Sequence, residues 1–207
     1  MVMNRGPYSH LCSGAGWHFF DPRPEDVRLE DLVASICRLN RYGSHIREDL
    51  DWYVVGEHGV RCAWLVRDLG GTALECYGAL HHDTHEGVPP GDVLGPFLRA
   101  MRSAEMCAVL GLTPAAFEGL LEVERRAKRA VREALGLTDV FANATSAKLI
   151  KHADDVLLAT ERRDLMAPSD LDWGPLPEPL RERIVPWAPR MARAQFMATH
   201  NALRAAL

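Results

Sequence analysis

Apolar residues recur every three to four positions along most of this chain, which is the spacing of amphipathic helices. The pattern predicts helices over residues 27–39, 52–69, 72–83, 92–101, 113–135 and 143–166, and a last helix that carries Met191, Phe196, His200 and Leu203. No region is rich in the two-residue alternation of a half-buried strand. The predicted fold class is therefore all-α, a helical bundle.

Start and stop signals accompany these periodic segments. Thr72 is a predicted N-cap, and Gly70-Gly71 ends the helix before it. Thr113 is followed by proline, a combination that is typical of a helix start, and Gly136 is the matching stop.

The two ends of the chain differ from its middle. Glycine and proline punctuate residues 1–24, which predicts an irregular segment, and the aromatic residues around Trp17 are expected to pack onto the body. Residues 167–207 form a proline-rich extension that closes with the last helix, and two tryptophans in it are expected to cover the core, Trp173 and Trp187. A chain of this length is within reach of one core, so residues 1–207 are predicted to form a single domain.

Composition indicates an ordinary soluble globular protein, with 47% hydrophobic and 25% charged residues. The net charge of -4 gives no broad basic field, so duplex nucleic acid is not an expected partner. No stretch resembles a signal peptide or a membrane span, and we expect a cytoplasmic protein (in the host cytoplasm if it is phage-encoded). The five cysteines include no Cys-x-x-Cys pair, and most of them are expected to be small core residues.

Candidate chemistry is concentrated in residues 81–86, which hold three imidazoles and two carboxylates. These side chains suit Zn, Mn, Fe or Co as metal ligands. His58 falls on an apolar helix face, where an isolated histidine is more often a packed core residue than a ligand. Asp154 lies four residues after Ile150 and three before Leu157, so its carboxylate points into the core, which is costly unless a metal or cation pairs with it.

Three helices thus each offer inward polar groups: His58, then His82-Asp83, then Asp154. A set of metal ligands that leaves room for a bound water molecule is typical of a catalytic metal site. The order resembles that of the HD-domain metal-dependent phosphohydrolases, an all-helical superfamily. The matching segments lie within residues 12–190 and are Arg41–His45, Tyr53–Val60, Ala79–Glu86, Gly91–Val93 and Ile150–Asp154. Their flanking residues are similar to those of 5′-deoxynucleotidases and of related phage enzymes, including dATP triphosphohydrolases.

Two features depart from the pattern of this superfamily. His85 stands where the superfamily has a small residue, and residues 46–51 form an insertion. Both are expected near the mouth of the pocket, where they bear on substrate preference. Of the pair His81-His82, the second immediately precedes the aspartate and is the predicted ligand, so His81 is expected to have a packing role.

The resemblance implies one divalent ion, with Zn, Co, Mn, Fe and Mg all admissible, held by His58, His82, Asp83 and Asp154. Glu86 is implied to orient or deprotonate a water, to protonate the leaving oxygen, or to help hold a second ion. Arg41 is implied to neutralise the phosphate, with Lys151 as a second cation.

Three further residues have two open interpretations. Asp92 either contacts the sugar side of a substrate or serves as the N-cap of a short helix. Tyr42 and Trp52 either stack against a base or pack into the core.

The function implied by the resemblance is removal of phosphate from a deoxynucleoside 5′-monophosphate. The alternatives are release of triphosphate from a deoxynucleoside triphosphate, and a non-catalytic nucleotide-binding protein. A plain helical bundle is less satisfactory, because it does not explain Asp154 in an apolar stripe. The resemblance also implies a homo-oligomer, a dimer or higher, in which the last helix is either a contact or a cover for the core.

Overall fold

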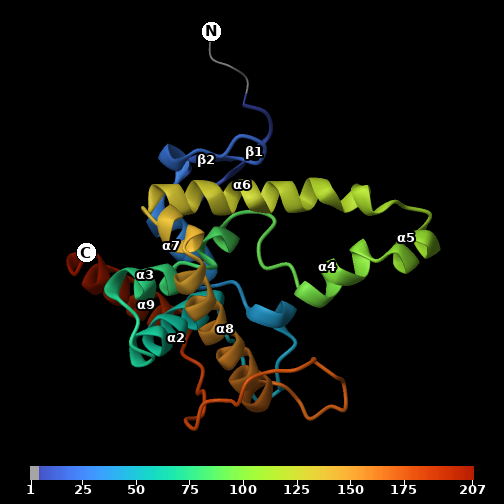
Figure 1. The fold of residues 1–207 in the computed structure, drawn as a ribbon. Coiled ribbons are helices and arrows are strands. Elements are labelled where there is room, and N and C mark those ends of the chain that lie inside the picture. The colour runs from blue at the N-terminus through green and yellow to red at the C-terminus, as the bar shows by residue number, and fades with distance from the viewer. Residues whose placement is uncertain (1–4) are drawn as a thin grey trace.

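Helices make up most of the structure, a computed structural model that describes residues 5–207 apart from the side chains of residues 114 and 116 (Figure 1). The α-helices are α1 (Leu29–Ile36), α2 (Val55–Asp68), α3 (Ala73–Leu80), α4 (Gly95–Arg102), α5 (Ala104–Leu110), α6 (Glu118–Ala134), α7 (Thr138–Ala142), α8 (Ala144–Leu165) and α9 (Pro189–Ala205). Short 3-10 helices lie between them: η1 (Pro24–Asp26), η2 (Arg41–Ser44), η3 (Thr84–Gly87) and η4 (Pro114–Phe117). The all-α prediction is confirmed, whereas the HD-type arrangement and the single domain stay predictions.

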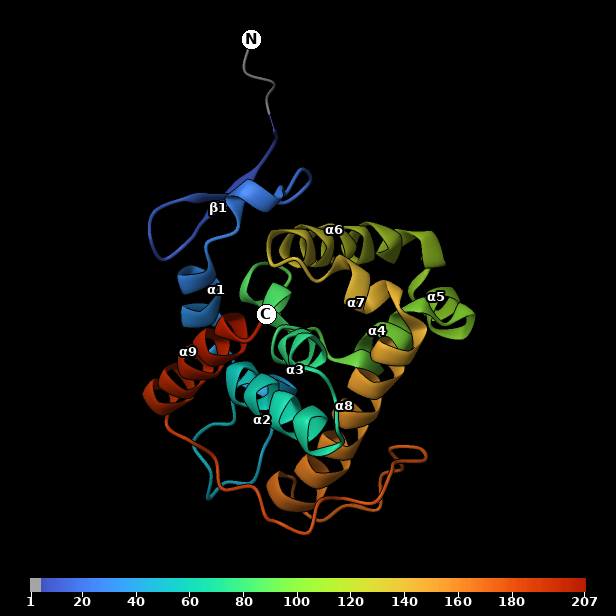
Figure 2. The same ribbon diagram turned by 60° about the vertical axis from the view of Figure 1, so that its left-hand side comes forward.

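The main hydrophobic core surrounds α2, which packs against α3, α8 and α9 (Figures 1 and 2). Its fully buried members include Val60, Leu80, Leu157 and Phe196. Burial of such a side chain contributes roughly 1.5–3 kcal/mol, so these helices are held mainly by their shared apolar face. Of the two roles left open for the last helix, the structure shows that α9 covers the core.

The N-terminal segment contains a short antiparallel hairpin of β1 (Tyr8–His10) and β2 (Gly16–His18), where an irregular stretch was predicted. Leu11 N–H donates to Ala15 O at 2.8 Å, and the positive φ of Gly14 closes the turn. Trp17 is fully buried in a second cluster, so its predicted packing is confirmed. This cluster joins the hairpin to α1, α6 and the segment after η3 through Leu32, Ala127, Val131 and Val88.

Local signals placed several helix starts correctly. Thr72 Oγ1 accepts the N–H of Glu75 at 3.2 Å, and Glu75 Oε2 accepts the N–H of Thr72 at 2.8 Å, which is a complete capping box. Asn143 caps α8 through its side chain alone, whose Oδ1 accepts the N–H groups of Thr145 and Ser146. By contrast, α2 begins three residues later than predicted because Val55 N–H bonds to Leu39 O at 2.9 Å, and the chain before it is extended.

The end of α3 sets the position of the predicted metal ligands. The helix stops at Leu80, so His82 and Asp83 lie in a turn and not in the helix. In a continuing helix the N–H of Asp83 would bond to Ala79 O, but the His82 ring takes this carbonyl at 2.6 Å. The axes of α2 and α3 approach closely at Gly59, where a Cβ atom would lie 2.7 Å from Leu80 O.

The segment between η3 and α6 differs most from the prediction. Helix α4 begins at Gly95 with proline in its first turn and Leu94 as its N-cap, so the N-cap interpretation of Asp92 is wrong. Thr113 makes no capping hydrogen bond, because a 3-10 turn separates it from α6. Helices α5 and α7 were not predicted. Helices α4 and α5 lie on the side of the molecule away from α9 (Figures 1 and 2).

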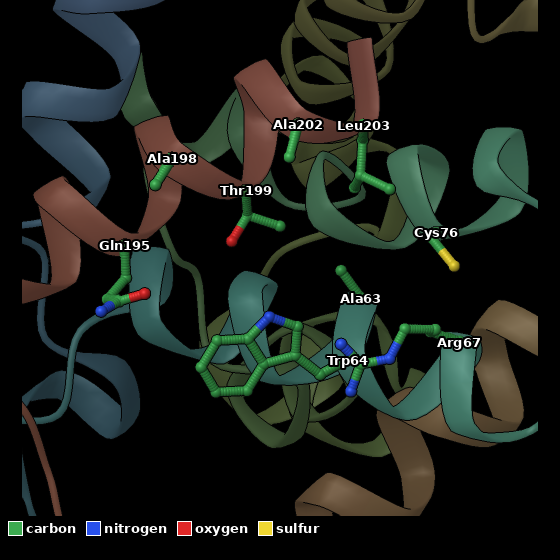
Figure 3. A pocket seen from close by; sticks show the side chains of 9 residues that line it. All are labelled: Ala63, Trp64, Arg67, Cys76, Gln195, Ala198, Thr199, Ala202 and Leu203. Carbon is green, nitrogen blue, oxygen red and sulfur yellow. The ribbon is translucent and has the colours of Figure 1, made fainter. Parts of the chain in front are cut away.

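A cavity of about 320 Å³ lies between α2, α3 and α9 (Figure 3). Trp64 and Thr199 line it from opposite sides. Four of the five cysteines are buried, as expected, and Cys12 is exposed. Within residues 5–207, no helix combines the length and the apolar character that a membrane span requires.

Candidate metal centre

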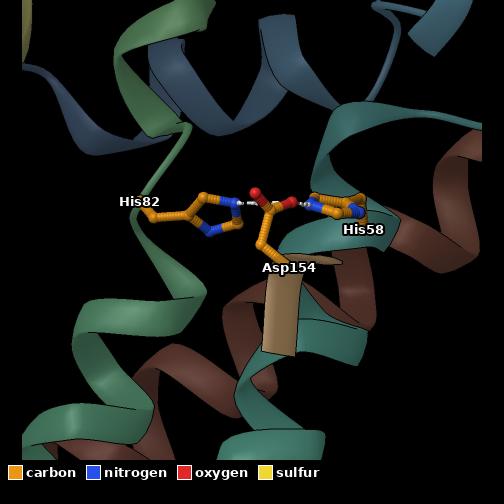
Figure 4. Close-up of side chains that lie close together, drawn as sticks. All are labelled: His58, His82 and Asp154. Atoms are coloured by element: carbon orange, nitrogen blue, oxygen red, sulfur yellow. Dashed lines mark hydrogen bonds and ion pairs between the residues drawn. The ribbon is translucent and has the colours of Figure 1, made fainter. Parts of the chain in front are cut away.

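Three predicted ligands from separate parts of the chain meet at one point. His58 comes from α2, His82 from the turn after α3, and Asp154 from α8. One ligand atom from each lies within 4.8 Å of the others, and the Asp154 carboxylate lies between the two imidazole rings (Figure 4). This cluster could hold a metal ion.

The hydrogen-bond network fixes the protonation pattern of the two rings. His82 Nδ1 lies 2.6 Å from Ala79 O, and a carbonyl only accepts, so Nδ1 must carry the proton. His58 Nδ1 lies 2.6 Å from Glu161 Oε1 and donates in the same way. If both rings are neutral, their Nε2 lone pairs face each other at 3.3 Å. Two lone pairs at that distance repel each other unless a cation lies between them.

Three distances between the candidate ligand atoms suit a divalent ion, whereas the 3.9 Å between His82 Nε2 and Asp154 Oδ1 is longer. His58 Nε2 lies 3.2 Å from Asp154 Oδ1, and His82 Nε2 lies 3.1 Å from Asp83 Oδ2. An ion bound at about 2.1 Å in tetrahedral or octahedral geometry holds neighbouring ligand atoms roughly 3.0–3.4 Å apart. Asp83 Oδ2 is 4.0 Å from His58 Nε2, which places it at the edge of the same cluster.

The charges around the cluster favour a cation. Burial and Arg41 oppose protonation of His58, but the carboxylates of Glu161 and Asp154 outweigh them and raise the His58 pKa to about 9. Burial also opposes ionisation of Asp154, yet the hydrogen bond and charge of His58 lower the Asp154 pKa strongly. In the free protein, a proton on His58 therefore supplies the positive charge that these carboxylates favour. Binding of a metal ion would release that proton.

Glu161 is the functional residue that the sequence analysis missed. It is fully buried and accepts hydrogen bonds from His58 Nδ1, from Tyr53 OH at 2.8 Å and from Tyr42 OH. Burial opposes its ionisation, but Arg41 and His58 lower its pKa to about 2. It stands seven residues after Asp154, two turns along the same face of α8, and this spacing was the available signal.

Arg41 joins the cluster to the buried carboxylate. Its Nε lies 3.3 Å from Glu161 Oε2 and its Nη1 lies 3.6 Å from Asp83 Oδ2. The structure therefore places this predicted phosphate-binding residue beside the predicted ligands.

Glu86 lies in η3, immediately beyond the cluster. Its Oε2 is buried and has no hydrogen-bond partner among the described residues. Burial, followed by the charges of Asp83 and Asp92, raises its pKa well above the ordinary value. The pKa of Asp92 is raised as well, first by burial and then by Asp83, while Arg41 opposes the shift. These shifts favour the protonated form of Glu86, and its Oε2 is available to a ligand.

Of the other residues predicted to contact the substrate, Lys151 and Tyr42 lie near the cluster, whereas Trp52 packs elsewhere. Lys151 Nζ is exposed and lies 2.9 Å from Asp154 Oδ2 and 2.6 Å from Asp155 Oδ1. Tyr42 contacts the cluster through Glu161. Trp52 packs against the main core cluster.

The two remaining histidines of the 81–86 stretch are buried outside the cluster. His81 lies 3.0 Å from Thr84 Oγ1 and 2.9 Å from His200 Nδ1, in accordance with its expected packing role. His85 Nε2 lies 3.7 Å from Glu124 Oε1 of α6. His85 thus faces α6, and the structure does not bring it to the predicted ligands.

Comparison with known proteins gives one similar protein without a described activity. No protein-family model matches the chain. The chain is 26% identical over 200 residues to the uncharacterized protein YfdR of Escherichia coli (strain K12), a similarity that covers 94% of this chain and 96% of that protein. The similarity therefore extends over nearly the whole of both chains.

Proposed function

We propose that this protein is a divalent-metal-dependent phosphohydrolase of the HD type that removes phosphate from a deoxynucleoside 5′-monophosphate. The observation that carries the proposal is the convergence of two imidazole Nε2 atoms, 3.3 Å apart, with the carboxylate of Asp154. The Arg41 guanidinium beside Asp83 adds a cation at the place where a phosphate would meet the ion.

The residues divide into those that hold the ion and those that act on the substrate. His58, His82 and Asp154 would hold the ion, with Asp83 as the fourth ligand. A bound divalent ion lowers the pKa of a coordinated water and offsets charge on the phosphoryl group. Glu161 orients His58 through its Nδ1–H, and such an outer partner also raises the basicity of the ligand.

Arg41 and Glu86 would act on the substrate directly. Arg41 binds a non-bridging phosphate oxygen, which neutralises charge and fixes the orientation of the phosphate. The raised pKa of Glu86 favours its protonated form, which would donate its proton to the leaving 5′-oxygen. Its alternative role, as a ligand of a second ion, requires Glu86 to be ionised.

A triphosphate substrate is the second candidate, and one observation favours it. The Nε of Arg132 is buried and has no hydrogen-bond partner among the described residues, and its guanidinium lies 3.7 Å from the centre of the Phe141 ring. The charge of Asp83 acts on Arg132, and that of Lys128, one turn earlier on α6, acts on Glu86. The charges of Arg132 and Lys128 thus act on carboxylates around the cluster, which suits additional phosphate groups, and Lys128 Nζ also pairs with Glu124 at 3.2 Å.

A non-catalytic nucleotide-binding protein is the third candidate. The chain keeps all four implied ligands together with Glu86, and loss of catalysis would be expected to remove at least one of them. The proposed partners are the deoxynucleotide and further copies of this chain, and the proposed location is the cytoplasm.

Product analysis tests the proposal. Metal-stripped protein is reloaded with Zn, Co, Mn, Fe or Mg and incubated with each deoxynucleoside mono- and triphosphate, and products are separated by chromatography. Free phosphate and nucleoside support the first candidate, and intact tripolyphosphate supports the second. Absence of turnover with every metal would refute both.

Four variants separate metal binding from chemistry. His58→Ala and Asp154→Ala are expected to lose metal and turnover together. Glu86→Gln is expected to keep the metal and to lose most of the turnover. His152→Ala is the control, because this histidine is exposed on α8 two residues before Asp154.

A further inference from the structure

A second cavity, of about 580 Å³, lies against the C-terminal half of α8. Its walls include His45 after η2, Arg162 of α8, Met166 at the C-cap of this helix, and Leu171 and Trp173 of the proline-rich segment. None of the candidate metal ligands lines it. Its volume is in the range of cavities that hold small molecules.

A row of two aromatic rings with a guanidinium group at each end leads from the metal cluster to this cavity. It starts at Arg41, which lies 3.6 Å from Asp83 Oδ2 and 5.4 Å from the centre of the Tyr42 ring. The Tyr42 ring centre is 6.0 Å from that of Trp173, and the Arg162 guanidinium lies 5.5 Å from the Trp173 ring. The row therefore runs from Arg41, beside the cluster, to Trp173 and Arg162, which line the cavity.

Trp173 is held in this row by a local turn. The N–H of Gly174 donates to Asp172 Oδ1 at 2.8 Å, and Gly174 has a positive φ. Trp173 was expected to cover the core, but it is absent from the described core clusters and stands instead at the cavity.

Arg162 presents a charge that no carboxylate offsets. Its Nη2 donates to Leu171 O at 3.0 Å, which holds the side chain near Trp173. Among residues 5–207, no ion pair to Arg162 is found within 4.0 Å. The neighbouring Arg163, by comparison, is paired with Asp164 at 2.8 Å.

The cavity lies at a suitable distance for the far end of a nucleotide. Arg162 follows Asp154 by eight residues, which is about 12 Å along the axis of α8. An aromatic face beside a guanidinium binds planar rings that carry hydrogen-bond acceptors, which describes a nucleobase. We propose that this cavity binds the base of the nucleotide, with Trp173 stacking on the ring and Arg162 donating to its edge. The proposal rests on the proposed function for the position of the phosphate.

The first test compares two substrates that differ only in the base. For a deoxynucleoside 5′-monophosphate, Trp173→Ala is expected to raise KM by about 5- to 100-fold with kcat little changed, because stacking on an aromatic residue is worth that much. For 2-deoxyribose 5-phosphate, which has no base, the same variant is expected to match the unmodified protein. Trp173→Phe keeps a ring and should restore most of the nucleotide affinity.

The matched control is Trp64→Ala, which removes a tryptophan from the other cavity (Figure 3). It should leave both substrates unaffected. If Trp173→Ala changes the two substrates equally, or changes neither, the cavity does not bind the base.

The second test needs no turnover, so it separates this inference from the proposed function. Binding of each deoxynucleoside to the full chain is measured by equilibrium dialysis. Trp173→Ala should lose this binding and His58→Ala should keep it, even if no metal supports hydrolysis. Nucleoside binding that persists unchanged in Trp173→Ala would overturn the inference.

Discussion

Replacement of Glu161 by glutamine removes the charge behind the metal cluster while it keeps the size of the side chain. The carboxylate is fully buried and accepts from His58 Nδ1 at 2.6 Å and from Tyr53 OH at 2.8 Å, with Arg41 Nε at 3.3 Å. A glutamine has a single acceptor oxygen, and its amide group only donates. With that oxygen at the Oε1 position, His58 and Tyr53 keep their acceptor, but Tyr42 OH, which bonds to Oε2, meets an amide group that accepts nothing. The charge of Arg41 also loses its nearest anion.

Two magnitudes follow from this environment. The pKa of Glu161 falls from the ordinary 4.5 to about 2, against the effect of burial. At about 1.36 kcal/mol per pKa unit, the carboxylate contributes on the order of 3 kcal/mol of stability at neutral pH. Loss of the outer partner of a metal-binding histidine weakens metal affinity by about 10- to 100-fold.

The assay measures both quantities in the same preparations. Urea unfolding of the metal-free protein gives the stability, and competition with a chromogenic chelator gives the affinity for Zn or Co. Glu57→Gln is the matched control: Glu57 is also fully buried, and it bonds to Arg61 at 2.7 Å and to Trp187 N at 2.8 Å, away from the cluster. The control should leave metal affinity unchanged whatever it does to stability.

Two outcomes would refute the role assigned to Glu161. One is a Glu161→Gln variant that is folded and binds metal within twofold of the unmodified protein. The other is an equal loss of affinity in Glu57→Gln. If Glu161→Gln does not fold, Tyr53→Phe removes one donor to the same carboxylate and keeps its charge, and it should cost about 1 kcal/mol of stability.

Three further predictions concern pH, backbone packing and metal removal. The folded pKa of Glu161 lies below its unfolded value, so its stabilisation is present above pH 4.5 and is lost as the pH falls toward about 2. The free energy of unfolding of Glu161→Gln should therefore fall less steeply with decreasing pH over this range than that of the unmodified protein. Gly59→Ala should destabilise by about 1–3 kcal/mol, since its Cβ would lie 2.7 Å from Leu80 O, whereas Gly119→Ala on α6 meets nothing within 4 Å and should be neutral or stabilising in a thermal melt. Metal added at 100 times its Kd should stabilise the stripped protein by about 2.7 kcal/mol, and no such shift is expected for His58→Ala; a Tm that ignores added metal would contradict the metal centre.

Much of the fold follows from local patterns in the sequence. The helical period of apolar residues predicts α2, α6, α8 and α9, and the N-cap Thr72 predicts where α3 begins, because both depend on residues within a few positions of each other. The boundaries that failed depend on hydrogen bonds that the helical period does not show. The start of α2 is set by a hydrogen bond to Leu39 O, and the end of α3 by the ring of His82 on Ala79 O.

The candidate ligands could be found in the sequence by their type and by their placement. Asp154 is conspicuous because a carboxylate in an apolar stripe is costly without a cation. The sequence did not show Glu161 as a partner of His58, since a single buried glutamate is not distinguishable from a solvated one until the helices are placed. The proline-rich sequence around Trp173 likewise did not indicate that this residue lines a cavity.

The sequence by itself therefore determined the helices and the kinds of side chain that face inward, because these properties repeat along the chain with a fixed local period. Only the tertiary structure decided that His58 and His82 bring their Nε2 atoms to 3.3 Å. That distance depends on the close approach of α2 to α3 at Gly59 and on the orientation of each ring by Glu161 and Ala79 O. The contacts at Gly59 and Glu161 join residues that are far apart in the chain, and no local period encodes them.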